Sequence, residues 1–306
     1  MEDTVMKQID TFCKKIPLVI VMGVVVFMLT VGTTQQGAAQ WTFMFIKGNG
    51  NITEFYDSDG NTYRPDPSFK IEFPYYVFLG QRTFPVSGFL DDWGSSLTVG
   101  MITVFCNVRM TANGVTETSG FTQMWWWTYA TLGTKYLDLT LAYIMDLDDQ
   151  RTIEGQFPTT NLSDEIRAMA VGKVPLGDFT LYGGIDYFYM LPHQSGPHEV
   201  KPGDLFIPLV GVSRDFSLGE NTSLGVDISM RYRSFAATQL DGVSQNDHGY
   251  QLGILPTFTL SYKNYFVQWL LGGLQDEYQP YGFTLAGENG VSHTSLDFRM
   301  HLGVSI

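Results

Sequence analysis

The C-terminal segment, residues 296–306, alternates between apolar and polar or small side chains at every position. Because successive side chains of a strand point to opposite faces, the segment predicts a strand with one apolar and one polar face. The apolar face carries Leu296, Phe298, Met300, Leu302, Val304 and Ile306. The pattern recurs along the chain, which is typical of a transmembrane β-barrel whose strands are apolar toward lipid and polar toward the lumen.

The N-terminus has the pattern of an export signal. Lys7, Lys14 and Lys15 precede an apolar run over residues 16–31, and the small residues 37–39 follow as a cleavage site. An uncleaved transmembrane anchor is the alternative, although the run is short for a spanning helix. We therefore expect a signal peptide over residues 1–39 and one outer-membrane β-barrel domain over residues 40–306.

Twelve strand-like runs follow the leader, joined by connections that alternate between short and long. Their positions predict an all-β, up-and-down antiparallel barrel with short periplasmic turns, long extracellular loops and an even number of strands. One connection, from Gly80 to Ser95, is long where a short turn is expected, and we predict an inward plug or a periplasmic cap there. The predicted strands are residues 41–47, 69–79, 97–108, 121–132, 136–146, 165–174, 179–189, 205–216, 223–234, 249–262, 265–274 and 296–306.

The composition agrees with an exported barrel and excludes some partners. A formal net charge of −13 argues against nucleic-acid binding, which needs basic patches. Charged residues make up only 16% of the chain, below the usual quarter or so of a soluble domain, and aromatic residues make up 14%. Two cysteines, Cys13 and Cys106, provide no disulfide framework. The expected partners are outer-membrane lipid, lipopolysaccharide bridged to acidic loops by divalent cations, and the barrel assembly machinery.

Alternation along two predicted strands assigns their faces. Ile228 and its even-numbered neighbours share one face opposite Asp227, and in the next strand Ile254 lies on the same face as Tyr250 and Tyr262. Those two tyrosines are about 40 Å apart along the strand at ~3.3 Å per residue, which suits interfacial positions at the two sides of a bilayer. This register predicts a lumen lined by Asp138, Asp186, Asp227, Arg231, Asp297, Arg299 and His301. These residues form either a structural charge network or the selectivity lining of a channel.

A run of three tryptophans, Trp125 to Trp127, follows a long connection. We predict that Trp125 and Trp127 point outward into the aromatic belt at the membrane interface. Trp126 would then point inward as a platform in the lumen, unless all three are interfacial anchors.

Two prolines, Pro208 and Pro256, lie inside predicted strands, where proline removes a hydrogen bond of the ladder. A closed barrel has no edge to accommodate them. They mark either harmless bulges or a lateral opening through which a hydrophobic solute leaves the lumen into the membrane.

The sequence carries no convincing catalytic or metal motif. Ser292 and His293 are adjacent, but no acid accompanies them in a known pattern. Residues 57–61 resemble the first half of a calcium loop without its later glutamate, and His193, His198 and Glu199 have no diagnostic spacing. We therefore expect no enzymatic activity, no cofactor and no metal.

Three short motifs resemble the outer-membrane family named for the MetA pathway of phenol degradation. They are Tyr56-Asp57 with Gly60-Asn61 after the first strand, residues 88–92, and Lys201-Pro202-Gly203-Asp204 before a strand. The resemblance implies a transport barrel for aromatic or other hydrophobic compounds, with no catalytic or binding residues to carry over. The predicted function is an outer-membrane channel for small hydrophobic solutes, aromatic compounds among them. A general or structural porin-like barrel is the alternative, and an outer-membrane lipid-modifying enzyme is a distant one.

Overall fold

The computed structural model of the chain describes a part of the 306 residues. The described residues are 40–52, 54–56, 62–86, 94–118, 122–147, 163–195, 197–244, 249–271, 276–278, 290–292 and 298–305. The predicted signal peptide, residues 1–39, lies outside them. In the part of the chain that is described, no helix is long and apolar enough to cross a membrane.

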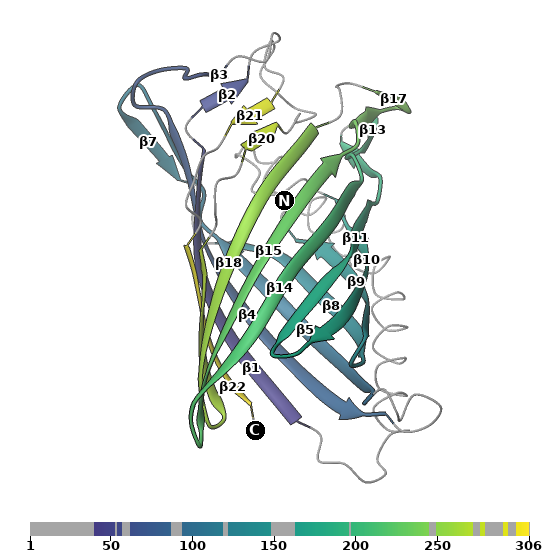
Figure 1. Cartoon of the computed structure of the whole chain (residues 1–306). Helices are drawn as coiled ribbons and strands as arrows, with labels where there is room; N and C mark the ends of the chain where they lie inside the picture. The colour runs from purple at the N-terminus through teal and green to yellow at the C-terminus, as the bar shows by residue number, and fades with distance from the viewer. Residues whose placement is uncertain are drawn as a thin grey trace, which may run out of the picture.

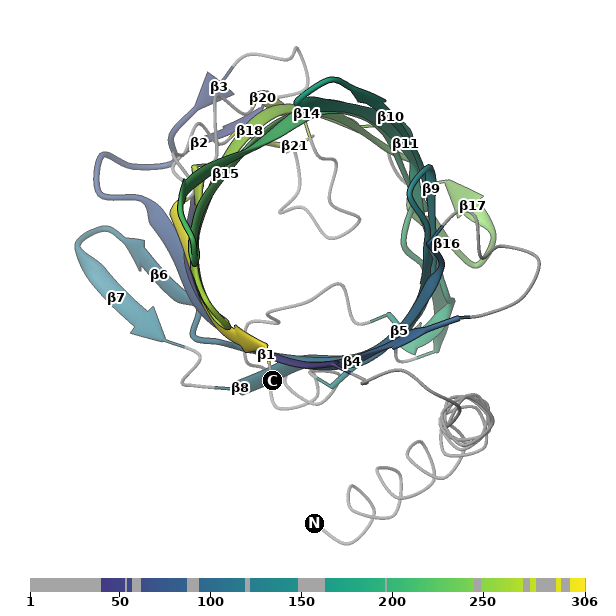
Figure 2. The same ribbon diagram turned by 60° about the horizontal axis from the view of Figure 1, so that its bottom comes forward.

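Twelve of the described strands form a closed antiparallel barrel, seen from the side in Figure 1 and along its length in Figure 2. Each strand pairs with its neighbour in the sequence, and the last strand pairs with the first, Phe45 lying opposite Leu302. The predicted fold is therefore confirmed. The barrel strands are β1 (Gln40–Ile52), β4 (Lys70–Pro85), β5 (Ser96–Cys106), β8 (Thr122–Gly133), β9 (Leu137–Asp146), β10 (Glu165–Leu176), β11 (Phe179–Met190), β14 (Leu205–Gly219), β15 (Thr222–Phe235), β18 (Gly249–Tyr262), β19 (Tyr265–Leu271) and β22 (Phe298–Ser305).

The outer face of the barrel is an exposed apolar band. Ile228 and Met230 of β15 are each 47% exposed, whereas Ser229 between them is 3% exposed and points inward. Ile254 of β18 is also exposed, and it lies opposite Met230 on the same face. Exposure of many large apolar side chains to water is unfavourable, so this band is a lipid-facing surface. The face assignment made from alternation is confirmed for these two strands.

The two ends of the barrel differ in their connections. At one end tight turns join the strands; Gly177 in the β10–β11 turn has a φ of 60°, a left-handed conformation that favours glycine. At the other end the connections are long and carry short strands (Figure 1): β2 (Glu54–Tyr56), β3 (Thr62–Tyr63), β12 (His193–Ser195), β13 (His198–Lys201), β16 (Gln239–Leu240), β17 (Val243–Ser244), β20 (Asp276–Tyr278) and β21 (Gly290–Ser292). By the usual rule the tight-turn end is periplasmic and the other extracellular.

The plug predicted from Gly80 to Ser95 is wrong for its first part. Strand β4 continues through Gly80 to Pro85 and pairs there with both β1 and β5, so these residues form barrel wall. The amide of Val86 donates to the carbonyl of Ser95 at 2.9 Å, which closes the connection. The polar residues beyond Gly80, such as Gln81 and Thr83, were predicted to form a loop, but they are inner-face positions of a longer strand. Residues 87–93 lie outside the described part.

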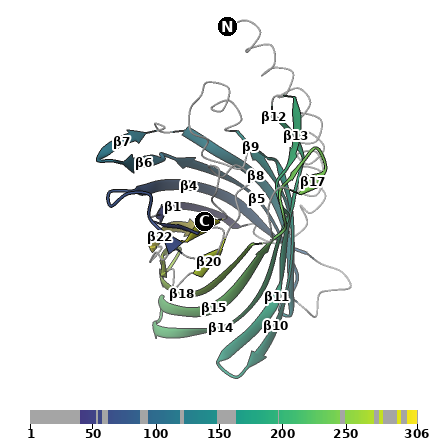
Figure 3. The same cartoon turned by 90° about the horizontal axis from the view of Figure 1, so that it is seen from above.

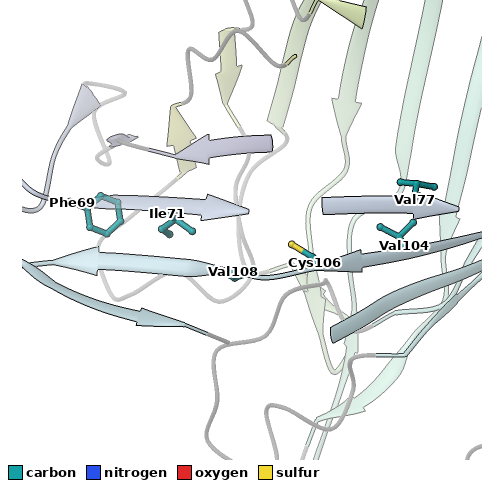
Figure 4. Close-up of a cluster of buried hydrophobic side chains, with 6 residues drawn as sticks. All are labelled: Phe69, Ile71, Val77, Val104, Cys106 and Val108. Atoms are coloured by element: carbon teal, nitrogen blue, oxygen red, sulfur yellow. The ribbon is translucent and has the colours of Figure 1, made fainter. Parts of the chain in front are cut away.

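Strands β1 and β4 also extend beyond the barrel at the extracellular end. The hairpin of β6 (Arg109–Ala112) and β7 (Val115–Thr118) pairs with the extension of β4 and lies outside the barrel ring (Figures 2 and 3). A buried apolar cluster joins this extension to the barrel wall (Figure 4) and consists of Phe69, Ile71, Val77, Val104, Cys106 and Val108.

Candidate functional site: the inner face of the barrel

The periplasmic half of the inner face is polar and is connected by hydrogen bonds between neighbouring strands. The Tyr129 hydroxyl donates to Gln81 Oε1 at 2.5 Å, and it reaches across β5 because Gly100 leaves room for the ring. Further bonds of 2.8–2.9 Å join Thr83 to Thr98, Thr131 to Thr140 and Gln268 to Thr259. Buried polar side chains of this half thus have partners on the wall itself, as buried polar groups require.

Charged residues of the inner face are paired as well. Asp138 accepts from Lys173 Nζ at 2.8 Å, and Asp227 accepts from the Tyr182 hydroxyl at 2.8 Å. Tyr182 crosses β14 over Gly211, where a Cβ atom would come within 2.3 Å of the ring. Three of the predicted lumen residues, Asp138, Asp186 and Asp227, are therefore held by partners that the sequence analysis did not single out.

Asp186 has the most completely buried of these carboxylates. It is 3% exposed and accepts two hydrogen bonds from Arg167, from Nε at 2.8 Å and from Nη2 at 2.7 Å. The guanidinium carbon of Arg167 also lies 5.9 Å from the Trp127 ring centroid and 5.1 Å from that of Phe188, in reach of cation–π attraction. Arg167 could have been predicted as an inner-face residue from the sequence, because it lies between Ile166 and Ala168, which both point outward.

The remaining predicted lumen residues are less completely placed. Arg231 of β15 lies opposite Leu209 and Gly253, on the inner face with Ser229. The backbones of Arg299 and His301 in β22 pair with those of Leu270 and Gln268. The side chains of these two residues, and Asp297 as a whole, lie outside the described part of the structure.

On one side of the barrel, from β1 to β9, the extracellular half of the inner face is mostly apolar, which alternation in the sequence did not predict. Leu79 of β4, Ile102 of β5 and Trp127 of β8 lie opposite one another on the inner face. On β9, Ile144 points inward as well and is 0% exposed. The missed signal is a strand that is apolar on both faces, such as residues 71–79, because one of those faces must point into the barrel. This apolar wall consists of Ile46, Val77, Leu79, Ile102, Val104, Trp125, Trp127 and Ile144. Two of its residues, Val77 and Val104, are drawn in Figure 4.

The tryptophan triplet has the opposite orientation from the one predicted. Trp126 is exposed at 37% on the outer face, opposite Met145, while Trp127 contacts Arg167 inside the barrel. Trp125 packs against the buried apolar cluster and pairs with Val104 on the inner face. The outward assignment of Trp125 and Trp127 is wrong because the inner face is itself apolar here, so apolar character no longer marks the lipid side. Tyr262 is outward and 54% exposed, and the Tyr250 side chain is not described.

Neither strand proline creates a bulge. Between β14 and β15 the paired residues run to Phe206 and Ser234 and resume at Leu209 and Arg231, so the ladder is interrupted at Pro208 without a change of register. Pro256 lies opposite Ile228 in an uninterrupted ladder with β15. The two prolines therefore differ in their ladders with β15: the β14–β15 ladder is interrupted at Pro208, whereas at Pro256 the β15–β18 ladder is continuous and the described β18–β19 ladder ends at the adjacent Thr257.

The motif that includes Gly203 and Asp204 has a structural role. Asp204 accepts from the Tyr187 hydroxyl at 2.8 Å and from the Met190 amide at 3.0 Å, and its carbonyl accepts from the Ala236 amide at 2.9 Å. A Cβ at Gly203 would lie 1.6 Å from the Ala236 carbonyl oxygen. The motif thus closes the extracellular rim where β11, β14 and β15 end.

In the small extracellular sheet of β12, β13, β16 and β17, His198 Nδ1 lies 2.7 Å from Asp241 Oδ2. The hydrogen bond with His198, together with the Glu199 amide, lowers the pKa of the exposed Asp241 carboxyl below its usual value. No group of three His, Cys, Asp or Glu residues that could hold a metal ion occurs among the described residues. The Ser292–His293 pair and residues 57–61 fall outside the described side chains.

Comparisons with known proteins support the fold. No family model matches the sequence, and no curated protein matches it. The crystal structure of an outer membrane channel from Pseudomonas putida F1 matches with a TM-score of 0.62 at 15% identity, over 89% of this chain and 96% of that chain. The β domain of the Bordetella autotransporter BrkA matches with a TM-score of 0.47 at 10% identity, over 87% and 98% of the two chains. A Pseudomonas aeruginosa FadL homologue gives a TM-score of 0.34 at 12% identity, over 87% and 89%.

The resemblance to the MetA-pathway family thus stays a prediction. The expected location agrees with the fold and with the exposed apolar band. The chain has the fold of a bacterial outer-membrane β-barrel.

Proposed function

We propose that this protein is an outer-membrane channel for small hydrophobic solutes, aromatic compounds among them. The observation that carries the proposal is the apolar wall on the extracellular half of the inner face. The inner face of a transmembrane barrel is normally polar, because it meets water. An apolar inner wall favours solutes that partition out of water, by roughly 25 cal/mol for each Å² of apolar surface removed from it.

The test is influx of a hydrophobic dye, N-phenyl-1-naphthylamine, into cells of a Gram-negative host whose intact outer membrane excludes it. Cells that produce the barrel are expected to take up the dye faster than cells with an empty vector. Ile102→Asn places an amide on the apolar wall and is expected to slow this influx. Thr98→Asn, on the same strand and face but in the polar half, is the matched control and should leave influx unchanged. Equal influx with and without the barrel would contradict the proposal.

A general pore is the second candidate, and the paired charges of the periplasmic half favour it. Such a pore would admit a hydrophilic β-lactam such as nitrocefin, whose hydrolysis by a periplasmic β-lactamase reports influx. Fast nitrocefin influx without dye influx would select this candidate. A purely structural barrel would pass neither compound, and a lipid-modifying enzyme would alter the acyl composition of outer-membrane lipid.

We further propose that a hydrophobic solute leaves the barrel sideways near Pro208. Two features support this route. The β14–β15 ladder is interrupted there, and the inner face near it changes from the apolar Ile207 and Leu209 to the polar Ser213 and Asp227. An apolar solute that continued along the barrel axis would have to cross the polar half, whereas the exposed outer face leads to lipid.

The proposed surroundings follow from the same faces. Outer-membrane lipid would cover the apolar band, and lipopolysaccharide would meet the long extracellular connections of this acidic chain through divalent cations. Insertion by the barrel assembly machinery is part of the same proposal.

A further inference from the structure

We propose that the inner face around Trp127 binds neutral solutes that combine an apolar body with a hydrogen-bond acceptor oxygen, such as aryl ketones and esters. This inference deepens the proposed function, because it names the chemistry that the channel would prefer among hydrophobic solutes. It rests on unused hydrogen-bond donors within an otherwise apolar wall.

Two indole nitrogens provide the first donors. Trp125 Nε1 and Trp127 Nε1 are both buried, and neither has a hydrogen-bond partner in the described part of the protein. Both side chains are inward. Their neighbours across the ladder are Val104, Ile102 and Ile144, and the buried Asp146 lies opposite Trp125 on β9. A buried donor without a partner is destabilising, so such groups are rare and call for an explanation. A solute oxygen that accepted these hydrogen bonds would remove that cost.

Arg167 supplies a third donor beside Trp127. Its Nε and Nη2 atoms are committed to Asp186, and Nη2 also lies 3.6 Å from Met169 Sδ. Among the described residues, Nη1 has no hydrogen-bond partner. The guanidinium lies between the rings of Trp127 and Phe188, so a donor is held between two apolar faces. A planar solute seated against these rings would bring its oxygen toward the donor side.

The local charge selects a neutral acceptor. The single guanidinium of Arg167 is already neutralised by Asp186, and Glu165, on the same strand and face, is only 7% exposed. A carboxylate solute would therefore meet three buried carboxylates, those of Asp186, Glu165 and Asp146, against one cation. It would also lose its hydration on a mostly apolar wall. A carbonyl, ester or ether oxygen accepts a hydrogen bond without either cost.

The indole rings of Trp125 and Trp127 are partly exposed, whereas their Nε1 atoms are buried. A solute therefore reaches the nitrogen by a small shift of the ring as it packs against the exposed part. An apolar body that fits flat against an aromatic ring is stabilised both by the burial of apolar area and by stacking.

The experiment measures equilibrium binding of two probes of similar shape, 4-fluoroacetophenone and 4-fluorocumene, which differ in a carbonyl oxygen against a methyl group. Fluorine NMR titrations are done with the full chain in lipid nanodiscs, and empty nanodiscs correct for partition into lipid. We expect wild-type protein to bind the ketone about tenfold more tightly than the hydrocarbon, since tenfold corresponds to about 1.4 kcal/mol. Trp127→Phe keeps an aromatic ring but removes the N–H, and it should reduce the ratio of affinities toward one.

Trp126→Phe is the matched control, because Trp126 is the adjacent residue on the outer face. It should keep the wild-type ratio. Equal affinities of wild-type protein for the two probes, or a ratio that survives Trp127→Phe, would overturn the inference. Because binding is measured at equilibrium, dye influx without ketone preference would contradict only this inference, and ketone preference without influx would contradict only the channel.

Discussion

The side chains of the inner face are stabilised differently in the two halves of the barrel, while the outer face is apolar at both heights. In the periplasmic half, side chains of neighbouring strands hydrogen-bond to each other, as Thr131 and Thr140 do at 2.8 Å. In the extracellular half, side chains such as Ile144 are buried by packing. Both residues, Thr140 and Ile144, belong to the same face of β9. The difference teaches that a strand pattern identifies the lipid side only where the inner face is polar, because two apolar faces look alike in sequence.

The largest effect is expected on the outer face. Ile228→Arg places a charge on the exposed apolar band and should lower the free energy of unfolding by about 2–4 kcal/mol. Asp227→Asn, the neighbour on the inner face, keeps an acceptor for the Tyr182 hydroxyl and should change it by less than about 1 kcal/mol. Urea titrations of barrels folded into lipid vesicles provide the measurement. Similar losses in both variants would mean that the two faces are misassigned.

The contrast between the halves predicts that two substitutions on β9 differ in how much they destabilise the protein. Ile144→Thr removes buried methyl surface and adds a hydroxyl to an apolar wall, so it should destabilise the protein by about 2 kcal/mol. Thr140→Val removes the bond with Thr131 in the polar half and should cost about 1 kcal/mol. The same urea titration compares them. If Thr140→Val proved the more damaging, packing would matter less than hydrogen bonding in this wall.

The boundary between the halves is tested at the prolines. Pro208→Val should restore a ladder hydrogen bond between β14 and β15, raise the stability by about 1 kcal/mol and slow dye influx. Pro256→Val is the comparison, because the ladder of Pro256 with β15 is already continuous, and influx should then stay unchanged. Influx that is unaffected by Pro208→Val while stability rises would place the solute route along the barrel axis.

The smallest effect is expected outside the membrane, in the extracellular sheet. Because the folded-state pKa of Asp241 is lowered by its hydrogen bond with His198, the stabilisation is present above the unfolded pKa of an aspartate, about 4, and is lost as the pH falls through the lower folded value. The protection factor of the Glu199 amide, which corrects the exchange rate for its intrinsic pH dependence, should therefore fall at acid pH. Asp241→Asn should show little of this fall, and an equal fall in the variant would mean that other groups cause it.

Much of the fold could be predicted from the sequence because lipid imposes a strict requirement on one face. The predicted strand over residues 223–234 corresponds to β15, Thr222–Phe235, and the predicted turn at Lys263 and Asn264 lies where β18 ends and β19 begins. The prediction was poorer where a strand departs from alternation. Residues of β4 beyond Gly80 were read as a plug, because Gln81 and Arg82 interrupt the apolar pattern at the periplasmic end.

The candidate site was predicted less well, and the tryptophans show why. A bulge separates Gln123 from Trp125 in the pairing with β5, so the faces before and after it cannot be inferred by counting. With an apolar inner wall, the outward and inward members of the triplet also look alike in sequence. Exposure, 37% at Trp126, decided the orientation.

By itself the sequence determined where most strands run, which ends carry the tight turns and, on strands that alternate such as β15 and β18, which face meets lipid, because these follow from local alternation and turn residues. The tertiary structure decided the partners of the inner charges. Arg167 and Asp186 lie 19 positions apart, Asp138 and Lys173 35, and Tyr182 and Asp227 45. Only the register between strands brings such residues to one height. The tight turn fixes that register for Arg167 and Asp186 on the β10–β11 hairpin. For Asp138 with Lys173, across a long connection, and for Tyr182 with Asp227, across β14, no local turn fixes it.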